Sequence, residues 1–84
     1  MEERFRKRIV VNSKIMAGKP VIKGTRIPVD AIINRLAEGM TIKEIIEDFP
    51  NLKKEDIYAA LHYSAEIIRG EKIIPLVKKG KIYA

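Results

Sequence analysis

The sequence predicts a mainly α-helical domain with a short N-terminal β ribbon, a three-helix core and an extended C-terminal tail. The chain has 84 residues, too few for two independent hydrophobic cores. Its middle holds three segments with helical apolar periodicity, and β-branched runs precede them. We therefore divide one domain into a basic arm with the ribbon (1–28), a trihelical core (29–70) and a tail (71–84).

Two short β-branched runs, residues 8–11 and 21–23, predict the ribbon. Gly18 and Pro20 lie between them and break regular structure. Because a two-stranded ribbon is marginally stable alone in water, we expect it to lie on the helices or to pair with a second subunit. A homodimer is therefore the expected assembly.

The first core helix is expected to begin at Pro28. A proline suits the first turn, because its missing N–H would have no intrahelical partner there. Gly39 can adopt the left-handed conformation that ends a helix. One apolar stripe is expected along this helix, formed by Val29, Ile32, Ile33, Leu36 and Ala37.

A second helix is expected after Thr41, which forms a capping-box pattern with Glu44. Pro50 stops this helix. Its apolar side is expected to comprise Ile42, Ile45, Ile46 and Phe49.

The third helix is the longest periodic segment, from Lys53 to about Arg69, and Gly70 closes it. We expect one apolar face on it, formed by Ile57, Ala60, Leu61, Ser64 and Ile68. The tight turn between the last two helices indicates a helix-turn-helix.

Charge is unevenly distributed along the chain, whose net charge is +6. Residues 1–28 hold eight Lys or Arg against two Glu, whereas residues 29–71 hold five basic against nine acidic residues. The last stretch, 72–84, has four lysines and no acidic residue. A polyanion should therefore be attracted first to the two ends of the chain.

The run GKPVIKGTRIPV, residues 18–29, invites comparison with a phosphate-binding loop. A P-loop requires Lys directly after its second glycine and a helix directly after the loop. Here Lys23 precedes Gly24, and Pro28 intervenes before the helix. The run therefore lacks the spacing that nucleotide binding needs.

A structural role for the same run is the main alternative. Gly24 permits a turn, Ile27 packs beneath the helix start, and Pro28 fixes the direction of the chain. Thr25 belongs to this turn, and Arg26 could tie it to a carboxylate or to helix carbonyls through its planar guanidinium. A contact between this run and nucleic acid stays open.

A family motif is formed by Gly18, Pro20, Gly24, Thr25, Arg26 and Pro28. It is followed by Gly39, Thr41, the run Asp48-Phe49-Pro50-Asn51-Leu52, the pair Asp56-Ile57 and the run Ala59-Ala60-Leu61. With this spacing, the chain resembles the prokaryotic family DUF433, a domain of unknown function, over about residues 8–69. The resemblance implies a homeodomain-like helix-turn-helix protein, often described as a VapB-type antitoxin. It also implies a partner, a toxin that resembles a PIN-domain ribonuclease, and repression of the pair's own promoter.

Seven residues are candidates for binding operator DNA: Arg4, Arg6, Lys7 and Arg8 in the arm, and Lys53, Lys54 and Tyr58 in the last helix. A helix-turn-helix reads base edges from the first half of its last helix. Three basic and three acidic residues make this helix electrically neutral, so a solvated helix face is an alternative. For the arm, the alternatives are a frayed terminus or a cationic edge that prevents aggregation.

The tail is the candidate toxin-binding segment. Its apolar residues would fill pockets on the toxin, and they are Ile73, Ile74, Leu76, Val77, Ile82 and Tyr83. Its lysines would meet the acidic surface of a metal-dependent nuclease. A tail that folds back onto its own core or onto a dimer mate is the competing interpretation.

Several classes of protein find little support in the sequence. Cysteine is absent and His62 is the single histidine, so we expect no disulfide, no metal site and no cofactor. No apolar stretch reaches the roughly eighteen residues of a membrane span, and no secretory signal is evident, which predicts a cytoplasmic protein. We expect no enzyme, because a nucleophile with a paired base is missing. A DNA-binding antitoxin is thus the first hypothesis, and a protein-interaction module of the same fold without DNA contact is the alternative.

Overall fold

The computed structural model describes residues 1–70 as a mainly helical fold with four α-helices and one two-stranded antiparallel sheet. In chain order the elements are α1 (Glu3–Arg6), β1 (Ile9–Val11), the 3₁₀ turn η1 (Met16–Gly18), β2 (Pro20–Ile22), α2 (Val29–Ala37), α3 (Ile42–Asp48) and α4 (Lys54–Arg69). No helix within these residues combines the length and apolar composition that a membrane-spanning segment requires.

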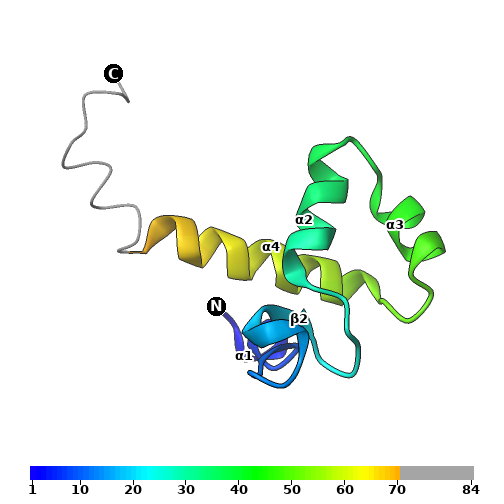
Figure 1. Ribbon diagram of the computed structural model, residues 1–84. Coiled ribbons are helices and arrows are strands. Elements are labelled where there is room, and N and C mark those ends of the chain that lie inside the picture. Colours follow the sequence, from blue (N-terminus) through cyan, green and yellow to red (C-terminus); the bar gives the residue numbers. More distant parts are fainter. Residues whose placement is uncertain (71–84) are drawn as a thin grey trace.

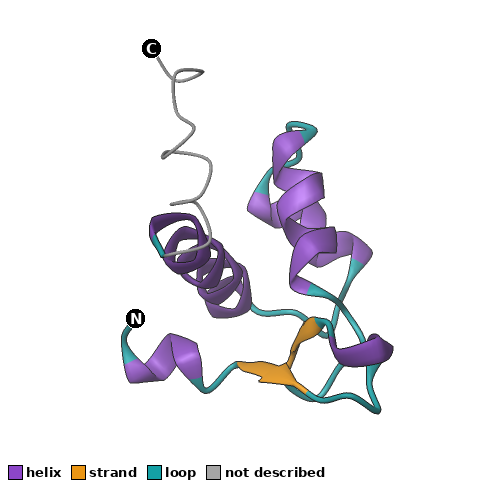
Figure 2. Ribbon diagram, turned by 60° about the vertical axis from the view of Figure 1, so that its left-hand side comes forward, coloured by secondary structure: helices purple, strands orange, loops and turns teal. Residues whose placement is uncertain are grey.

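Helix α4 is the element on which the others pack. It contacts α1, α2, α3 and β1, and it runs between α2 with α3 on one side and α1 with the strands on the other (Figure 1). The same arrangement is seen from a second direction in Figure 2. The buried core is formed by Ile22, Val29, Ile32, Ile45, Leu52, Ile57 and Ala60.

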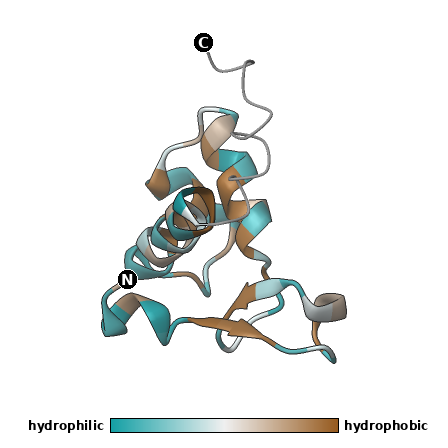
Figure 3. Ribbon diagram, turned by 90° about the vertical axis from the view of Figure 1, so that its left-hand side faces the viewer, coloured by the Kyte–Doolittle hydropathy of each residue, from teal (hydrophilic) through white to brown (hydrophobic). Residues whose placement is uncertain are grey.

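The predicted ribbon is confirmed. Strand β1 pairs with β2 in antiparallel register, with Ile9 opposite Ile22 and Val10 opposite Val21. Both strands are coloured as hydrophobic in Figure 3, and β2 packs on α2 while β1 packs on α4. The ribbon therefore lies on the helices, where burial of apolar side chains stabilises it.

The boundaries of α2 and α3 agree with the sequence signals. Pro28 takes the N-cap position with extended backbone, so α2 begins at the next residue. Gly39 follows the helix with a left-handed φ of 96°. The capping box at α3 is formed: Glu44 N–H donates to Thr41 Oγ1 at 3.1 Å, and Thr41 N–H donates to Glu44 Oε1 at 2.8 Å.

Three details of the predicted apolar faces are wrong. Leu61 and Ile68 are 42% and 61% exposed, and Ala37 is also exposed. Leu61 and Ile68 are exposed because the elements packed on α4 cover a different face of this helix. The covered face is centred on Asp56, Ala60 and Tyr63, so Leu61 and Ile68 point to solvent. Helix α4 does end at Gly70 as predicted, and this glycine has extended rather than left-handed backbone.

Helix α1 was not predicted, because the arm was interpreted as a basic segment without regular structure. Phe5 is 5% exposed, and its ring stacks on His62 of α4 with 4.5 Å between ring centroids.

The Met1 amino group pairs with Glu66, and this hydrogen bond lowers the pKa of Glu66. The pair therefore forms at neutral pH and is lost as the pH falls through that lowered pKa.

An ion pair joins the ribbon to the start of α4. Arg8 Nη1 lies 2.9 Å from Asp56 Oδ1, and the Asp56 side chain is almost fully buried. The second carboxylate oxygen, Oδ2, accepts the Lys53 backbone N–H at 2.9 Å and so caps α4. Asp56 thus fixes the first turn of α4 and the position of β1 at the same time.

We predict that Asp56→Ala lowers the free energy of unfolding by about 3 kcal/mol, because it uncaps α4 and leaves a half-buried guanidinium unpaired. Urea denaturation provides the measurement. Asp30→Ala is the matched control, since Asp30 pairs with Lys19 on the surface, and it should cost less than about 1 kcal/mol. Equal effects of the two changes would contradict this role of Asp56.

We predict that Phe5→Ala lowers the free energy of unfolding by about 2 kcal/mol and releases α1 from α4, because the ring supplies the buried contact of α1. Limited trypsin digestion should then cut after Arg6 faster than in the unmodified chain. Val11→Ala, at an exposed strand position, serves as the control. A digestion rate unchanged by Phe5→Ala would refute the docked position of α1.

Candidate functional site

A hollow of about 310 Å³ lies between the ribbon and the start of α4. It is lined by Lys7, Arg8, Lys23 and Asp56. The strand register brings Lys23 beside Arg8, since the Lys23 N–H donates to the Arg8 carbonyl at 2.8 Å. The hollow is therefore polar, and its rim carries more positive than negative charge.

Internal pairing changes the charge balance that the sequence of α4 indicates. Asp56 is neutralised by Arg8, and Glu66 is paired with the amino terminus. Glu55 is therefore the acidic residue of α4 left without an ion pair inside residues 1–70. The exposed start of α4 is consequently more positive than its composition suggests.

We define the basic surface as Lys7, Lys23, Lys53 and Lys54. All four side chains are exposed, and none forms a salt bridge within the described part of the chain. Lys7 and Lys23 line the polar hollow, and the backbone of Lys53 bonds to Asp56 in that hollow. The basic surface thus combines two lysines at the first turn of α4 with two that line the hollow beside that turn.

The seven residues predicted to bind DNA do not form one cluster. Lys7, Arg8 and Lys53 come together around Asp56, but Arg8 is held in its ion pair. Arg4 bonds to Glu2 and lies 4.6 Å from the centroid of the Phe5 ring.

Arg6 Nη2 donates to the Met1 carbonyl at 3.2 Å and so stays within the N-terminal segment. Lys54 is exposed in the first turn of α4, and Tyr58, at 38% exposure, lines a shallow hollow on that helix with Leu61 and His62.

Lys23 and Asp56 are the residues of this region that the sequence reasoning missed. The position of Lys23 could have been predicted from the sequence, because pairing the runs 8–11 and 21–23 in antiparallel register places Lys23 opposite Arg8. No local signal identified the Arg8–Asp56 pair, because its members are 48 positions apart.

The motif between β2 and α2 forms a hydrogen-bonded turn. Gly24 has a φ of 81°, which favours glycine. The Thr25 hydroxyl donates to the Ile22 carbonyl at 2.7 Å and accepts the Ile27 N–H at 3.0 Å. These contacts support the structural interpretation of Gly24 and Thr25. Arg26 differs, because it is exposed and forms no hydrogen bond or ion pair with any residue in 1–70.

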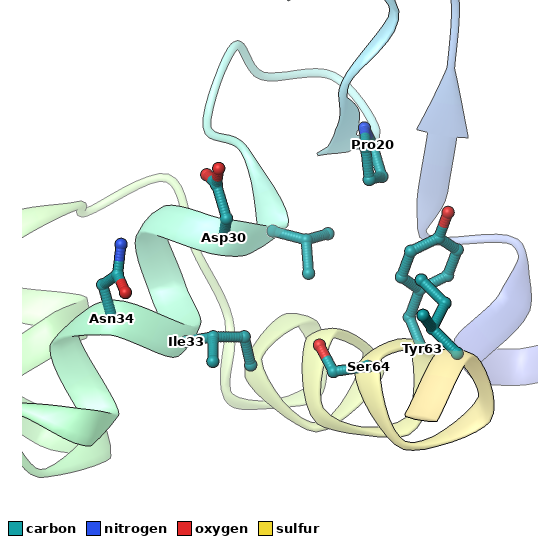
Figure 4. A pocket seen from close by; sticks show the side chains of 8 residues that line it. Pro20, Asp30, Ile33, Asn34, Tyr63 and Ser64 are labelled. Carbon is teal, nitrogen blue, oxygen red and sulfur yellow. The ribbon is translucent and has the colours of Figure 1, made fainter. Parts of the chain in front are cut away.

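An apolar groove of about 230 Å³ lies between α2 and α4. Residues of β2, α2 and α4 line it, among them Pro20, Val29, Ile33, Tyr63, Ser64 and Ile67. Figure 4 shows Ile33 and Ser64 facing one another across the groove, while Asp30 and Asn34 stand along α2 at its rim. The groove offers a surface to apolar side chains rather than to an anion.

The positions of the remaining predicted residues follow from these elements. Gly18 ends η1 with a left-handed φ, Pro20 begins β2, and Pro28 precedes α2. The predicted toxin-binding residues, from Ile73 to Tyr83, lie outside the described residues. Within the described part, no group of three or more potential metal ligands lies together.

Comparison with known proteins gives related sequences without an assigned activity. An uncharacterized protein of Archaeoglobus fulgidus is 83% identical over 24 residues, which are 29% of this chain and 67% of that protein. The uncharacterized protein y4eO of Sinorhizobium fredii is 34% identical over 59 residues, which are 69% of this chain but 27% of that protein.

A solved structure and a family profile agree with each other. The crystal structure of a DUF433 member protein from Anabaena variabilis is similar with a TM-score of 0.68 and 32% identity, covering 70% of this chain and 58% of that one. The profile described as "Protein of unknown function (DUF433)" matches residues 9–64, most of the chain. On this match, the chain belongs to the DUF433 family.

Proposed function

We propose that this chain is a non-enzymatic, dimeric helix-turn-helix protein that binds DNA through the basic surface and acts as the antitoxin of a PIN-like ribonuclease toxin. The observation that carries the proposal is the basic surface itself: four exposed, unpaired lysines of residues 1–70 gathered around the first turn of α4. The antitoxin role is inferred from the family resemblance, and it gives the chain a second proposed partner, the toxin.

The geometry of α3 and α4 supports a helix-turn-helix. The two helices are joined by residues 49–53 and both pack against α2. The outer face of α4 presents Lys54, Tyr58 and Leu61. In helix-turn-helix proteins the first half of the last helix enters the major groove, so Tyr58 occupies a position expected to approach base edges, while Lys54 lies near the phosphates.

Electrostatics supports contact with the DNA backbone. Lysines that neutralise phosphates release condensed counterions, which gives affinity without sequence specificity. Lys7 and Lys23 reach the basic surface from the arm and the ribbon, while Lys53 and Lys54 reach it from α4. Segments distant in sequence thus contribute to one phosphate-binding surface, and side chains of α4 such as Tyr58 supply the base contacts.

A second candidate function is a protein-interaction module that has this fold but does not bind DNA. The apolar groove between α2 and α4 favours it, together with exposed Leu61 and Ile68. Ile67 lines the groove three residues before Gly70, the last residue that the structure describes. A toxin bound by residues 71–84 would therefore also be within reach of the groove. Both candidate functions, the DNA-binding antitoxin and the protein-interaction module, would use the groove, and they differ in whether the chain binds DNA.

We predict that Lys53→Ala with Lys54→Ala lowers DNA affinity about tenfold at low salt and reduces the salt slope by about two, because two phosphate contacts are lost. Fluorescence anisotropy with a duplex from the chain's own upstream region provides the measurement. Lys14→Ala with Lys43→Ala removes the same charge from exposed positions elsewhere and is the matched control.

Two outcomes would count against DNA binding through this surface. Equal losses in the two double variants would mean that net charge alone governs affinity. No binding by the unmodified chain, even at low salt, would favour the protein-interaction module.

We predict that Ile73→Asp with Leu76→Asp abolishes neutralisation of the toxin, because charged side chains cannot enter apolar pockets. Co-expression with the proposed partner, a PIN-like ribonuclease toxin, scored by growth, provides the measurement. Lys78→Ser with Lys79→Ser is the control for a purely electrostatic contact. Full neutralisation by the first variant would remove the tail from the toxin-binding role.

A further inference from the structure

We infer that Arg26 contacts a phosphate group of duplex DNA, and that the turn from Ile22 to Ile27 is built to present it. The inference rests on the proposed DNA binding and adds to it a residue and a chemical role. In this inference Arg26 binds a ligand, whereas its neighbours Gly24 and Thr25 in the family motif form the turn.

The turn holds the backbone on both sides of Arg26. The Ile22 N–H donates to the Ile27 carbonyl at 3.0 Å, and the Thr25 N–H donates to the Ile22 carbonyl at 3.0 Å. The Thr25 hydroxyl adds two further hydrogen bonds, to the Ile22 carbonyl and from the Ile27 N–H. Four hydrogen bonds within six residues therefore fix the direction in which the Arg26 side chain leaves the chain.

The neighbours of Arg26 each have a role inside the fold. Ile22 is buried in the core, and Ile27 packs against it. Gly24 supplies the left-handed backbone, with open space around the position of a Cβ atom, so its conformation rather than close packing calls for glycine. Thr25 uses its hydroxyl as both donor and acceptor. Arg26 sends its charged group into solvent without a partner among residues 1–70, as Lys23 of the same turn does.

A rigid turn with a free guanidinium is suited to binding an anion. Ordering of the backbone precedes binding, so less conformational entropy is lost when the ligand arrives. The planar guanidinium donates two parallel hydrogen bonds to phosphate or carboxylate oxygens. The geometry of the turn therefore points to an anionic ligand outside the chain.

The surroundings of the turn select DNA over an acidic protein. Lys23, in the same turn, lines the polar hollow with Lys7, Arg8 and Asp56, and Asp56 belongs to the first turn of α4. Arg26 is a further exposed cation in the turn that contributes Lys23 to the basic surface. A row of phosphates supplies an anion for each cation, and backbone turns commonly contact phosphate in DNA-binding proteins.

The test compares Arg26→Ala with Arg69→Ala, which removes the same charge from an exposed position at the other end of α4. DNA binding is measured by anisotropy across a salt series, with the chain's own upstream duplex and a shuffled duplex as probes. We expect Arg26→Ala to weaken both about tenfold and to lower the salt slope by about one. Arg69→Ala should change neither affinity more than about twofold.

Two further variants separate binding from folding. The thermal midpoint of Arg26→Ala should equal that of the unmodified chain, because the side chain has no internal contact to lose. Arg26→Lys should recover part of the affinity, since it restores charge without the planar group. Thr25→Val should lower both the midpoint and the affinity, because it removes the two hydroxyl hydrogen bonds that hold the turn.

Four outcomes of these measurements would overturn the inference, and each points to a different explanation. Unchanged DNA affinity in Arg26→Ala, while the unmodified chain binds, overturns the inference and leaves the proposed function intact. A lowered thermal midpoint in Arg26→Ala shows a structural role instead. Loss of toxin binding with DNA affinity unchanged shows that the anionic partner is a protein. No DNA binding by the unmodified chain at low salt overturns both the inference and the proposed function.

Discussion

The ion pair between Arg8 and Asp56 is the constraint on which the arrangement of the N-terminal part depends. A carboxylate as buried as that of Asp56 requires a cation and hydrogen-bond donors nearby. Arg8 supplies the cation, and the Lys53 N–H supplies a donor at the start of α4. Because Arg8 immediately precedes β1, the same pair fixes the ribbon against α4. Lys7 and Lys23 are thereby brought to the first turn of that helix.

This arrangement gives α4 two chemically different surroundings. Near its start, the pairing of Asp56 leaves lysines from three segments facing outward, which suits a polyanion. Along its length, the groove against α2 is lined by apolar side chains such as Ile33, Tyr63 and Ile67, which suits a protein partner. The proposed function calls for one surface for DNA and one for a toxin, and the two surfaces lie at different places along α4.

The sequence predicted the elements that local signals specify, and it failed where distant segments meet. The capping box of Thr41 and Glu44, the left-handed Gly39 and the β-branched runs each act within a few residues, so their structures were predictable. The burial of Phe5 against His62 depends on the chain returning to α4, which no local pattern encodes. The same holds for the pairing that neutralises Asp56, so the basic surface could be predicted only in its separate parts.

We propose that the cations around the first turn of α4 face DNA. The most direct measurement is a titration of the isotope-labelled full chain with duplex DNA, followed by amide chemical shifts in NMR spectra. We expect the largest shifts in Lys7, Lys23, Arg26 and Lys53, and we expect them to diminish as salt is added. Shifts confined to the groove between α2 and α4, with these residues unchanged, would contradict it.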